Sequence, residues 1–273
     1  MGGVASIQFV DGGGRGRAER IARAAEAEAR RIEARFSRYR ESSVVSEINR
    51  NAGRTPVAVD EETEALVRTA LDLEELTLGR FDPTVGVLRR AWDFGTGRVP
   101  SRAEVDALLP LVDADEVRVR GRTVFLRQPG MELDLGGVGK EYAVDRVADL
   151  LREQGVRAAI VNFAGDVRTV GGRGDGRPWS IGVVDPRDPT RCRFAVRVLG
   201  GAGIATSGDY ERAFVAGGVR YHHILDARTG WPVRGLASAT VVAATTSLAG
   251  RYASAAFLFG PVDGLALLRD TPG

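Results

Sequence analysis

A glycine-rich turn in the middle of the chain carries residues suited to binding a phosphate. It reads Asp134-Leu-Gly-Gly-Val-Gly-Lys-Glu-Tyr-Ala-Val-Asp145, and Lys140 within it is the only lysine of the protein. Glycines let a backbone approach a phosphate closely, and the helix expected after the turn offers free N–H groups and a positive dipole end. The spacing matches neither the dinucleotide fingerprint nor the Walker pattern. From these residues alone, phosphate binding and a packed strand-to-helix turn are equally open.

A second cluster contains the only two histidines, His222 and His223. It consists of Ala205-Thr-Ser-Gly-Asp-Tyr210, Tyr221-His-His-Ile-Leu-Asp226 and Thr229-Gly230. Histidine is the usual general base near neutral pH, so this cluster is a candidate for taking a proton from a hydroxyl. The alternative is a structural histidine beside a strand.

Three other segments carry weaker signals. An aromatic ring beside two arginines in Phe36-Ser-Arg-Tyr-Arg40, followed by Ser46-Glu-Ile-Asn49, can stack on a planar ligand or simply end a helix. The segment Phe81-Asp-Pro-Thr-Val-Gly86, with Trp92-Asp-Phe-Gly95 after it, is typical of a turn-rich loop. We expect Asp166 and Asp185-Pro-Arg-Asp188 to lie in solvated acidic loops.

The elements that must position these residues follow from periodicity and capping signals. Apolar residues at helical spacing predict a helix over 17–37, Asp60 is a good N-cap for a helix that stops at Gly79, and Ser101 with Glu104 forms a capping box. Further helices are expected over 140–154 and 247–259, and the stretch 38–54 is expected to be a polar loop. Strands are expected over 6–10, 117–119, 123–126, 158–163, 179–184, 194–198 and 239–244, and another leads into the glycine turn.

The irregular mixture of these elements predicts an α+β fold with a largely antiparallel sheet, in one domain over 1–273. The formal net charge is only +2, which gives no case for a nucleic-acid partner. A single cysteine, Cys192, excludes a disulfide framework, and no apolar run is long enough to span a membrane. The N-terminus lacks the pattern of a signal peptide, so a cytoplasmic location is expected, with a removed leader as the alternative.

Taken together and in this order, the segments resemble the ApbE-like FAD:protein FMN transferases. The matching segments are Phe36–Arg40, Phe81–Gly86, Asp134–Asp145, Val161-Asn-x-x-Gly-Asp166, Asp185–Asp188, Ala205–Tyr210 and His223-Ile-Leu-Asp-x-x-Thr-Gly230. The resemblance implies the T-fold-like α+β fold of that family. It also implies FAD as substrate, Mg²⁺, and transfer of FMN to a Thr or Ser hydroxyl of a target protein with release of AMP. Such phosphoryl transfer depends mainly on positioning and on neutralising charge.

The resemblance also assigns roles to individual residues. It implies that Tyr39 faces the flavin, that Asp134 holds the adenosine part, and that His223 both contacts FAD and deprotonates the acceptor hydroxyl. The Gly137 carbonyl and the Ser254 hydroxyl are the implied metal ligands. The rest of the expected FAD-binding set is Met1, Arg80, Phe81, Asp82, Gly137, Lys140 and Ser207.

The sequence departs from the family at the metal site. The family's last helix reads Leu-Ala-Asp-x-x-x-Thr, but here it reads Leu248-Ala-Gly-Arg-Tyr-Ala-Ser254, so Gly250 stands where the carboxylate belongs. Mg²⁺ prefers hard oxygen ligands that usually include a carboxylate. Three explanations are open: another acid, Glu141 or Asp209, supplies the charge; Arg251 neutralises the phosphate directly; or the chain binds FAD without metal-dependent transfer. A related enzyme that cleaves FAD or uses a small-molecule acceptor is a further alternative.

Overall fold

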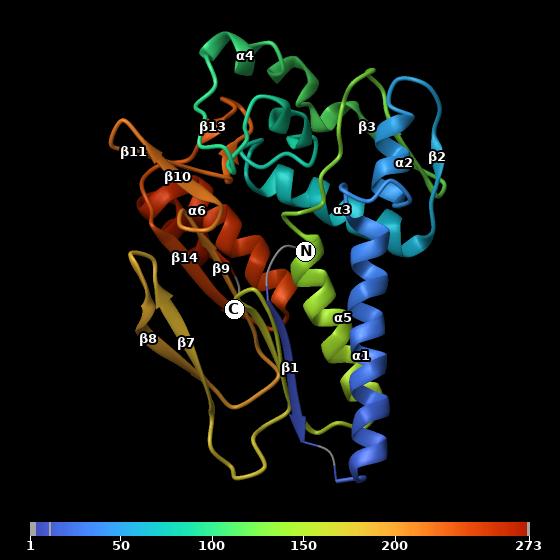
Figure 1. Cartoon of the computed structure of the whole chain (residues 1–273), viewed down its shortest axis with the longest axis vertical. Coiled ribbons are helices and arrows are strands. Elements are labelled where there is room, and N and C mark those ends of the chain that lie inside the picture. The colour runs from blue at the N-terminus through green and yellow to red at the C-terminus, as the bar shows by residue number, and fades with distance from the viewer. Residues whose placement is uncertain (1–3, 11, 272–273) are drawn as a thin grey trace.

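The computed structural model describes residues 4–10 and 12–271, so Met1, expected beside FAD, lies outside the described residues. A five-stranded sheet forms the centre of the lower part in Figure 1. All neighbouring strands in it are antiparallel, which confirms the expected α+β fold. In sheet order the strands are β1 (Ala5–Val10), β5 (Ala158–Phe163), β6 (Asp166–Val170), β9 (Gly203–Gly208) and β14 (Ser238–Ala243).

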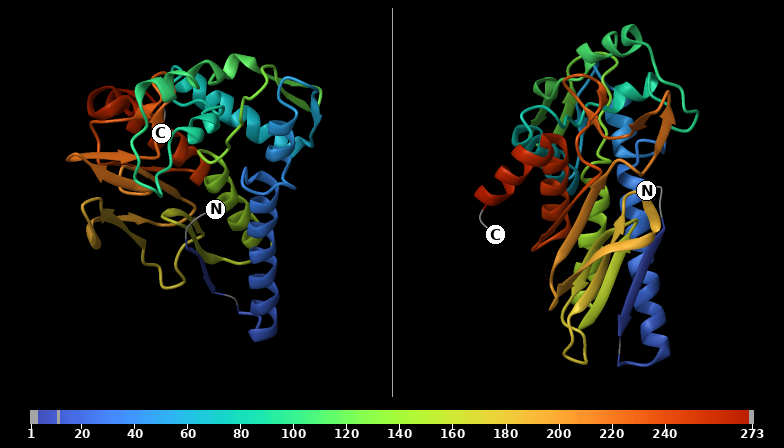
Figure 2. Two further views of the ribbon diagram at one scale, coloured as in Figure 1. Left: turned by 45° about the horizontal axis from the view of Figure 1, so that its top comes forward. Right: turned by 90° about the vertical axis from the view of Figure 1, so that its left-hand side faces the viewer.

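Two long helices cover this sheet, and a third packs on one of them. Helix α5 (Gly139–Glu153) packs on β5 and β6, and α6 (Thr246–Asp270) packs on β9 and β14. Helix α1 (Arg15–Phe36) lies along α5, as Figures 1 and 2 show. Apolar side chains of these helices are buried in the packing, with Ile32 of α1 and Leu151 of α5 among the largest fully buried ones. The helix pair α5 and α6 therefore forms the layer between the sheet and the rest of the chain.

A second group of elements lies above the sheet in Figure 1. It contains the helices α2 (Val44–Arg50), α3 (Glu61–Leu76) and α4 (Arg102–Asp106), and the small sheet β2-β4-β3, formed by Val57–Ala58, Thr123–Leu126 and Val117–Arg120. The expected N-cap at Asp60 is confirmed, because its side chain accepts from the Thr63 N–H. The capping box of Ser101 and Glu104 is confirmed too.

Two expectations about the elements were wrong. The polar stretch 38–54 contains α2, capped by Ser43 and buried only through Val45 and Ile48. No strand leads into the glycine turn, where Glu132 forms only an isolated bridge with Val85. The expected end of the last helix at Phe259 is confirmed, because Gly260, with a φ of 84°, breaks the helical backbone; a second helical segment then follows within α6. A short polar helix gives too few apolar positions for its period to be recognised.

The remaining strands form small hairpins. The longest is β7 (Trp179–Asp185) with β8 (Asp188–Val198), which pairs with no third strand among the described residues. The others are β10 (Ala213–Ala216) with β11 (Val219–His222) and β12 (Leu225–Asp226) with β13 (Trp231–Pro232). Within the described part of the chain, no helix is long and apolar enough to cross a membrane.

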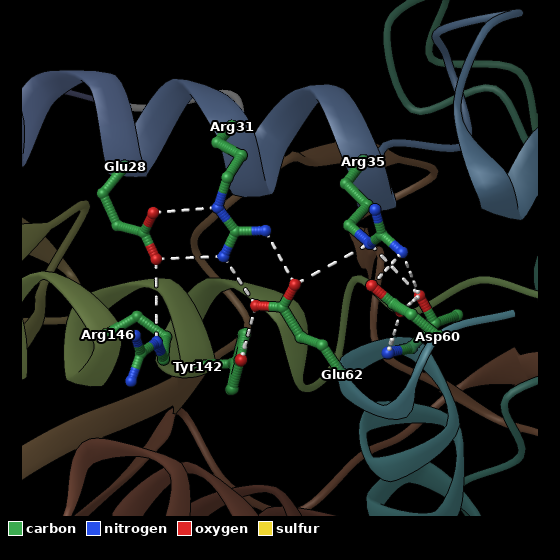
Figure 3. Close-up of polar contacts among 8 residues, drawn as sticks. Glu28, Arg31, Arg35, Asp60, Glu62, Tyr142 and Arg146 are labelled. Carbon is green, nitrogen blue, oxygen red and sulfur yellow. Dashed lines mark hydrogen bonds and ion pairs between the residues drawn. The ribbon is translucent and has the colours of Figure 1, made fainter.

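A polar network ties α1, α3 and α5 together, as Figure 3 shows. Arg31 of α1 binds Glu62 of α3 through both terminal nitrogens, at 2.6 and 2.7 Å. Tyr142 of α5 donates its hydroxyl to the same carboxylate at 2.7 Å. Arg31 also binds Glu28, at 2.8 Å from its Nε. One carboxylate thus joins three helices that are distant in sequence.

Candidate functional site

The glycine turn enters α5 without a side-chain cap. The Gly136 N–H donates to Asp134 Oδ1 at 2.8 Å, and the Gly139 N–H donates to the Leu135 carbonyl at 2.7 Å. A Cβ on Gly137 would lie 2.5 Å from the Phe81 ring, so the ring packs directly on that glycine. Only a residue without a side chain permits this approach. The turn therefore brings together Asp134, Phe81 and Gly137, three residues that the resemblance assigns to FAD binding.

Lys140 lies at the start of α5 and forms an ion pair with Asp166, with 2.6 Å between Nζ and Oδ2. The expectation that Asp166 is solvated was wrong, because it begins the central strand β6 and is only 2% exposed. Burial raises the pKa of Asp166, although Lys140 opposes that shift. Burial alone would lower the pKa of Lys140, but Asp166 and Glu141 outweigh it and raise that pKa. The single lysine thus stays positively charged at neutral pH.

Glu141, the next residue, turns its side chain toward α6. It is 9% exposed, and its Oε2 atom is buried with no hydrogen-bond partner. Burial, and then the charge of Asp166, raise the pKa of Glu141. A Cβ on Gly250 would lie 2.6 Å from Glu141 Cγ, so this side chain occupies the space beside Gly250.

The two serines expected in the site meet between α6 and the sheet. The hydroxyl oxygens of Ser254 and Ser207 are 3.2 Å apart. Ser254 lies four residues after Gly250, so both are on one face of α6. No group of three His, Cys, Asp or Glu side chains able to hold a metal occurs among the described residues. A metal held here would rely on carbonyl and hydroxyl oxygens for most of its protein ligands.

The two histidines have different surroundings. His222 is buried and uses both ring nitrogens, since Nε2 contacts the Val233 carbonyl at 2.8 Å and Nδ1 accepts from the Ile224 N–H. His223 contacts the Glu211 carbonyl through Nδ1 at 2.9 Å. A carbonyl oxygen only accepts, so Nδ1 carries the proton and Nε2 keeps its lone pair. His222 is therefore structural, and His223 is the one fit to accept a proton.

The charge state of His223 agrees with that role. Burial lowers the pKa of its imidazole to about 4, and the cations Arg212 and Arg89 act in the same direction. The ring is therefore neutral at pH 7. Glu211, whose carbonyl holds this ring, also acts electrostatically on Lys140 and helps to raise its pKa. Glu211 thus links the two parts of the site, because its carbonyl contacts His223 and its charge acts on Lys140 at the start of α5.

Two arginines connect the remaining site residues: Arg38, which the sequence showed beside Tyr39, and Arg89, which the sequence analysis missed. The Arg38 and Arg89 guanidinium carbons lie 5.8 and 5.9 Å from the centre of the Tyr39 ring. The same arginines approach Asp134 Oδ2, at 3.3 Å from Arg38 and 3.6 Å from Arg89. Tyr39 is 67% exposed and lines a groove of about 840 Å³ together with Glu132. The run Leu88-Arg-Arg90 was the available signal, but it lay in a segment read only as a loop.

Arg80 and Asp82 are engaged with the protein itself. Arg80 donates to Asp226 Oδ2 and to the Leu258 carbonyl, each at 3.2 Å. Asp82 accepts from the Thr84 N–H at 2.6 Å and from the Ala114 N–H at 2.9 Å. These bonds fix the loop that carries Phe81. Contact of Arg80 or Asp82 with FAD stays a prediction.

Comparison with known proteins places this arrangement in a family. The model of the ApbE family matches residues 1–273. An FAD:protein FMN transferase of Klebsiella pneumoniae is 37% identical over 235 residues, which cover 84% of this chain and 72% of that protein. The crystal structure of the ApbE protein of Thermotoga maritima superposes with a TM-score of 0.87 at 37% identity, covering 97% of this chain and 87% of that one. The flavin transferase ApbE of Vibrio cholerae gives a TM-score of 0.85 at 30% identity, covering 98% of this chain and 87% of that one. This chain belongs to the ApbE family.

Proposed function

We propose that this chain transfers the FMN part of FAD to a Thr or Ser hydroxyl of a target protein and releases AMP. Relatives at 37% and 34% identity are named for that reaction. The observation that carries the proposal is His223, whose Nδ1 is held by the Glu211 carbonyl and whose Nε2 is left as a proton acceptor. A neutral imidazole at pH 7 is the form that a general base requires.

The proposed step balances with the groups present. The acceptor oxygen forms a bond to the phosphorus of the FMN part, and the bond from that phosphorus to the oxygen bridging to AMP breaks. The hydroxyl proton passes to His223 Nε2, and AMP leaves with the electron pair on its phosphate oxygen. Lys140 and the uncapped start of α5 supply positive potential near the glycine turn.

Mg²⁺ is the metal that this family is expected to use. The Gly137 carbonyl and the Ser254 hydroxyl are hard oxygen donors. The carboxyl group of Glu141, whose Oε2 has no hydrogen-bond partner, packs beside Gly250, four residues before Ser254 on α6. This donor chemistry fits a magnesium ion. When bound, the ion would neutralise charge on the phosphates.

Incubation with FAD, Mg²⁺ and a candidate acceptor protein tests the proposal. We expect AMP, separated by chromatography, and a fluorescent flavin that stays on the acceptor after denaturing electrophoresis. The acceptor with its target Thr changed to Val is the matched control and should stay unlabelled. AMP release without an adduct would favour an FAD-cleaving enzyme instead. FAD binding without AMP, with any divalent metal, would favour a protein that only binds FAD.

A further inference from the structure

We propose that Glu141 of α5 supplies the carboxylate ligand for Mg²⁺ that is missing at position 250 of α6. The inference rests on the proposed function, since that function is the reason to expect the metal. In this proposal, the carboxylate that the family carries on α6 at position 250 is supplied instead by the neighbouring helix α5. Glycine at 250 is then required so that the glutamate can reach the site.

The packing of the two helices is the first argument. A Cβ on Gly250 would lie 2.6 Å from Glu141 Cγ and 3.0 Å from both Cδ and Oε1. The carboxyl group of Glu141 therefore lies where a side chain from position 250 would point. An aspartate at 250 and a glutamate at 141 exclude each other in this packing.

The second argument is that Glu141 has an unused oxygen. Its Oε2 is buried without a hydrogen-bond partner, and the residue is only 9% exposed. The neighbouring ammonium of Lys140 is engaged by Asp166 at 2.6 Å. Leaving a buried carboxylate oxygen unpaired is costly, so its chemistry calls for a proton or a cation as partner.

The third argument is the position of the other donors. Glu141 and Gly137 line the same small cavity, of about 70 Å³, between α3, α5 and α6. Ser254 follows Gly250 by one turn on the same face of α6. A carboxylate of α5, a carbonyl of the turn before α5 and a hydroxyl of α6 are thus the oxygen donors available where these two helices pack.

The helices are held in register by Asp145, one turn after Glu141 on α5. Its carboxylate accepts from the N–H groups of Thr246 and Ser247, each at 2.8 Å. It also accepts from the Ser247 hydroxyl at 2.7 Å. This cap fixes the start of α6 on α5, and so fixes Gly250 opposite Glu141.

The other candidates for the missing charge cannot act as metal ligands here. Both oxygens of Asp209 are bound by Arg187, at 2.6 and 2.7 Å. Arg251 lines the same cavity as Glu141 and has an unpartnered Nε, but its terminal nitrogen donates to the Asp72 carbonyl at 3.0 Å, and a guanidinium offers no oxygen to a metal ion. Of the three alternatives open from the sequence, a relocated carboxylate at Glu141 is the one this geometry supports.

Titration with Mn²⁺ tests the proposal, because Mn²⁺ accepts the oxygen ligands that suit Mg²⁺ and free Mn²⁺ is measured directly by electron paramagnetic resonance. Wild type is compared with Glu141→Gln, with and without FAD, after subtraction of an FAD blank. We expect Glu141→Gln to bind Mn²⁺ about tenfold or more weakly, since even groups that only support a ligand typically carry 10–100-fold. Glu153→Gln, which removes an exposed carboxylate from the end of α5, is the matched control and should bind as wild type does.

A double variant, Glu141→Gly with Gly250→Asp, moves the carboxylate to α6 and should restore most of the Mn²⁺ affinity. If Glu141→Gln does not fold, as judged by circular dichroism, the double variant is the test of the proposal. A folded double variant that does not bind Mn²⁺ overturns the proposal. Equal Mn²⁺ affinity of wild type and Glu141→Gln in both conditions also overturns it. These readouts are independent of catalysis. Failure of wild type to label an acceptor would instead refute the proposed function.

Discussion

The ring of His223 is held in one tautomer by a backbone carbonyl, and that contact decides which nitrogen can react. We predict that His223→Ala lowers the rate of FMN transfer by about 10²–10⁴-fold, the usual contribution of a general base. FAD affinity, followed by flavin fluorescence, should change little. If labelling continues at the wild-type rate, another group takes the proton.

The pH dependence of transfer should follow the same ring. The base must be neutral, and the pKa of His223 is lowered to about 4. Falling pH therefore protonates it only near that value, well below the range of an ordinary histidine. We expect the single-turnover rate of transfer to stay level from pH 8 to about 5.5 and to fall toward pH 4. A decline centred near pH 6.5, in a protein still folded by circular dichroism, would show that burial does not lower the pKa of His223.

At Gly250 two effects oppose each other. Alanine in place of glycine inside a helix typically gains about 1 kcal/mol. The added Cβ would meet Glu141 Cγ at 2.6 Å, and overpacking a buried contact costs about 1–3 kcal/mol. We predict that Gly250→Ala lowers the unfolding free energy measured with urea, and that this loss disappears in a Glu141→Ala background.

Gly139, at the start of α5, is the control for that substitution, because no atom lies within 4 Å of a Cβ built there. Gly139→Ala should not destabilise the protein. A gain in stability for Gly250→Ala with Glu141 present would show that the two positions do not compete for space. Because of this contact, restoring the family's aspartate at position 250 requires removal of Glu141 first, a condition that the sequence alone did not reveal.

At the scale of elements, the sequence predicted what local signals encode. The periodicity of α1 and the caps at Asp60 and Ser101 are confirmed, because each depends on residues within a few positions. Strand β6 and the burial of Asp166 were not predicted. An acidic residue in a sequence is expected to be exposed to solvent unless a partner for its charge is known. The partner of Asp166 is Lys140, which lies 26 positions earlier in the chain. The contact between Glu141 and Gly250 was hidden for the same reason.

The carboxylate of Glu62 joins three helices, and its contribution should depend on pH. Its hydrogen bonds with Arg31 lower its pKa below the usual 4.5, although burial opposes the shift. A lowered pKa in the folded state means that the stabilisation is present above the unfolded value and is lost as pH falls through the folded one. We predict that Glu62→Gln costs about 1–2 kcal/mol at pH 7.

The difference between wild type and Glu62→Gln, measured by urea unfolding, should narrow below pH 4.5. Glu61→Gln is the matched control from the same helical turn. The Glu61 side chain is 85% exposed and forms an ion pair with the exposed Arg122, so the Glu61→Gln variant should stay within about 0.5 kcal/mol of wild type. A constant difference across this pH range would mean that Glu62 acts through packing and not through its charge.

At the scale of the whole molecule, the site is assembled from distant parts of the chain on one rigid layer. Tyr39 follows α1, Asp134 precedes α5, and His223 follows the hairpin β10–β11. The central sheet with α5 and α6 keeps these pieces in place, and Arg89 lies among them near Tyr39 and Asp134. Such a site is encoded by the fold as a whole, which explains why the sequence indicated it through several ordered motifs and not through the chemistry of any single residue.

The hairpin β7–β8 is joined to this site by one strong contact. Its turn residue Arg187 forms two hydrogen bonds with Asp209, two positions before Glu211, whose carbonyl holds His223. We predict that Arg187→Ala increases amide hydrogen exchange both in β7–β8 and over residues 209–212, because both depend on that contact. Exchange in β5 and β6, which lie inside the five-stranded sheet, should stay unchanged.

The rate of FMN transfer by Arg187→Ala should fall while FAD binding persists, since the loop that orients His223 becomes less ordered. Arg177→Ala, which removes an exposed arginine from the loop before β7, is the control and should leave exchange over 209–212 as in wild type. Protection of 209–212 that survives Arg187→Ala would show that the loop is ordered by its other neighbours.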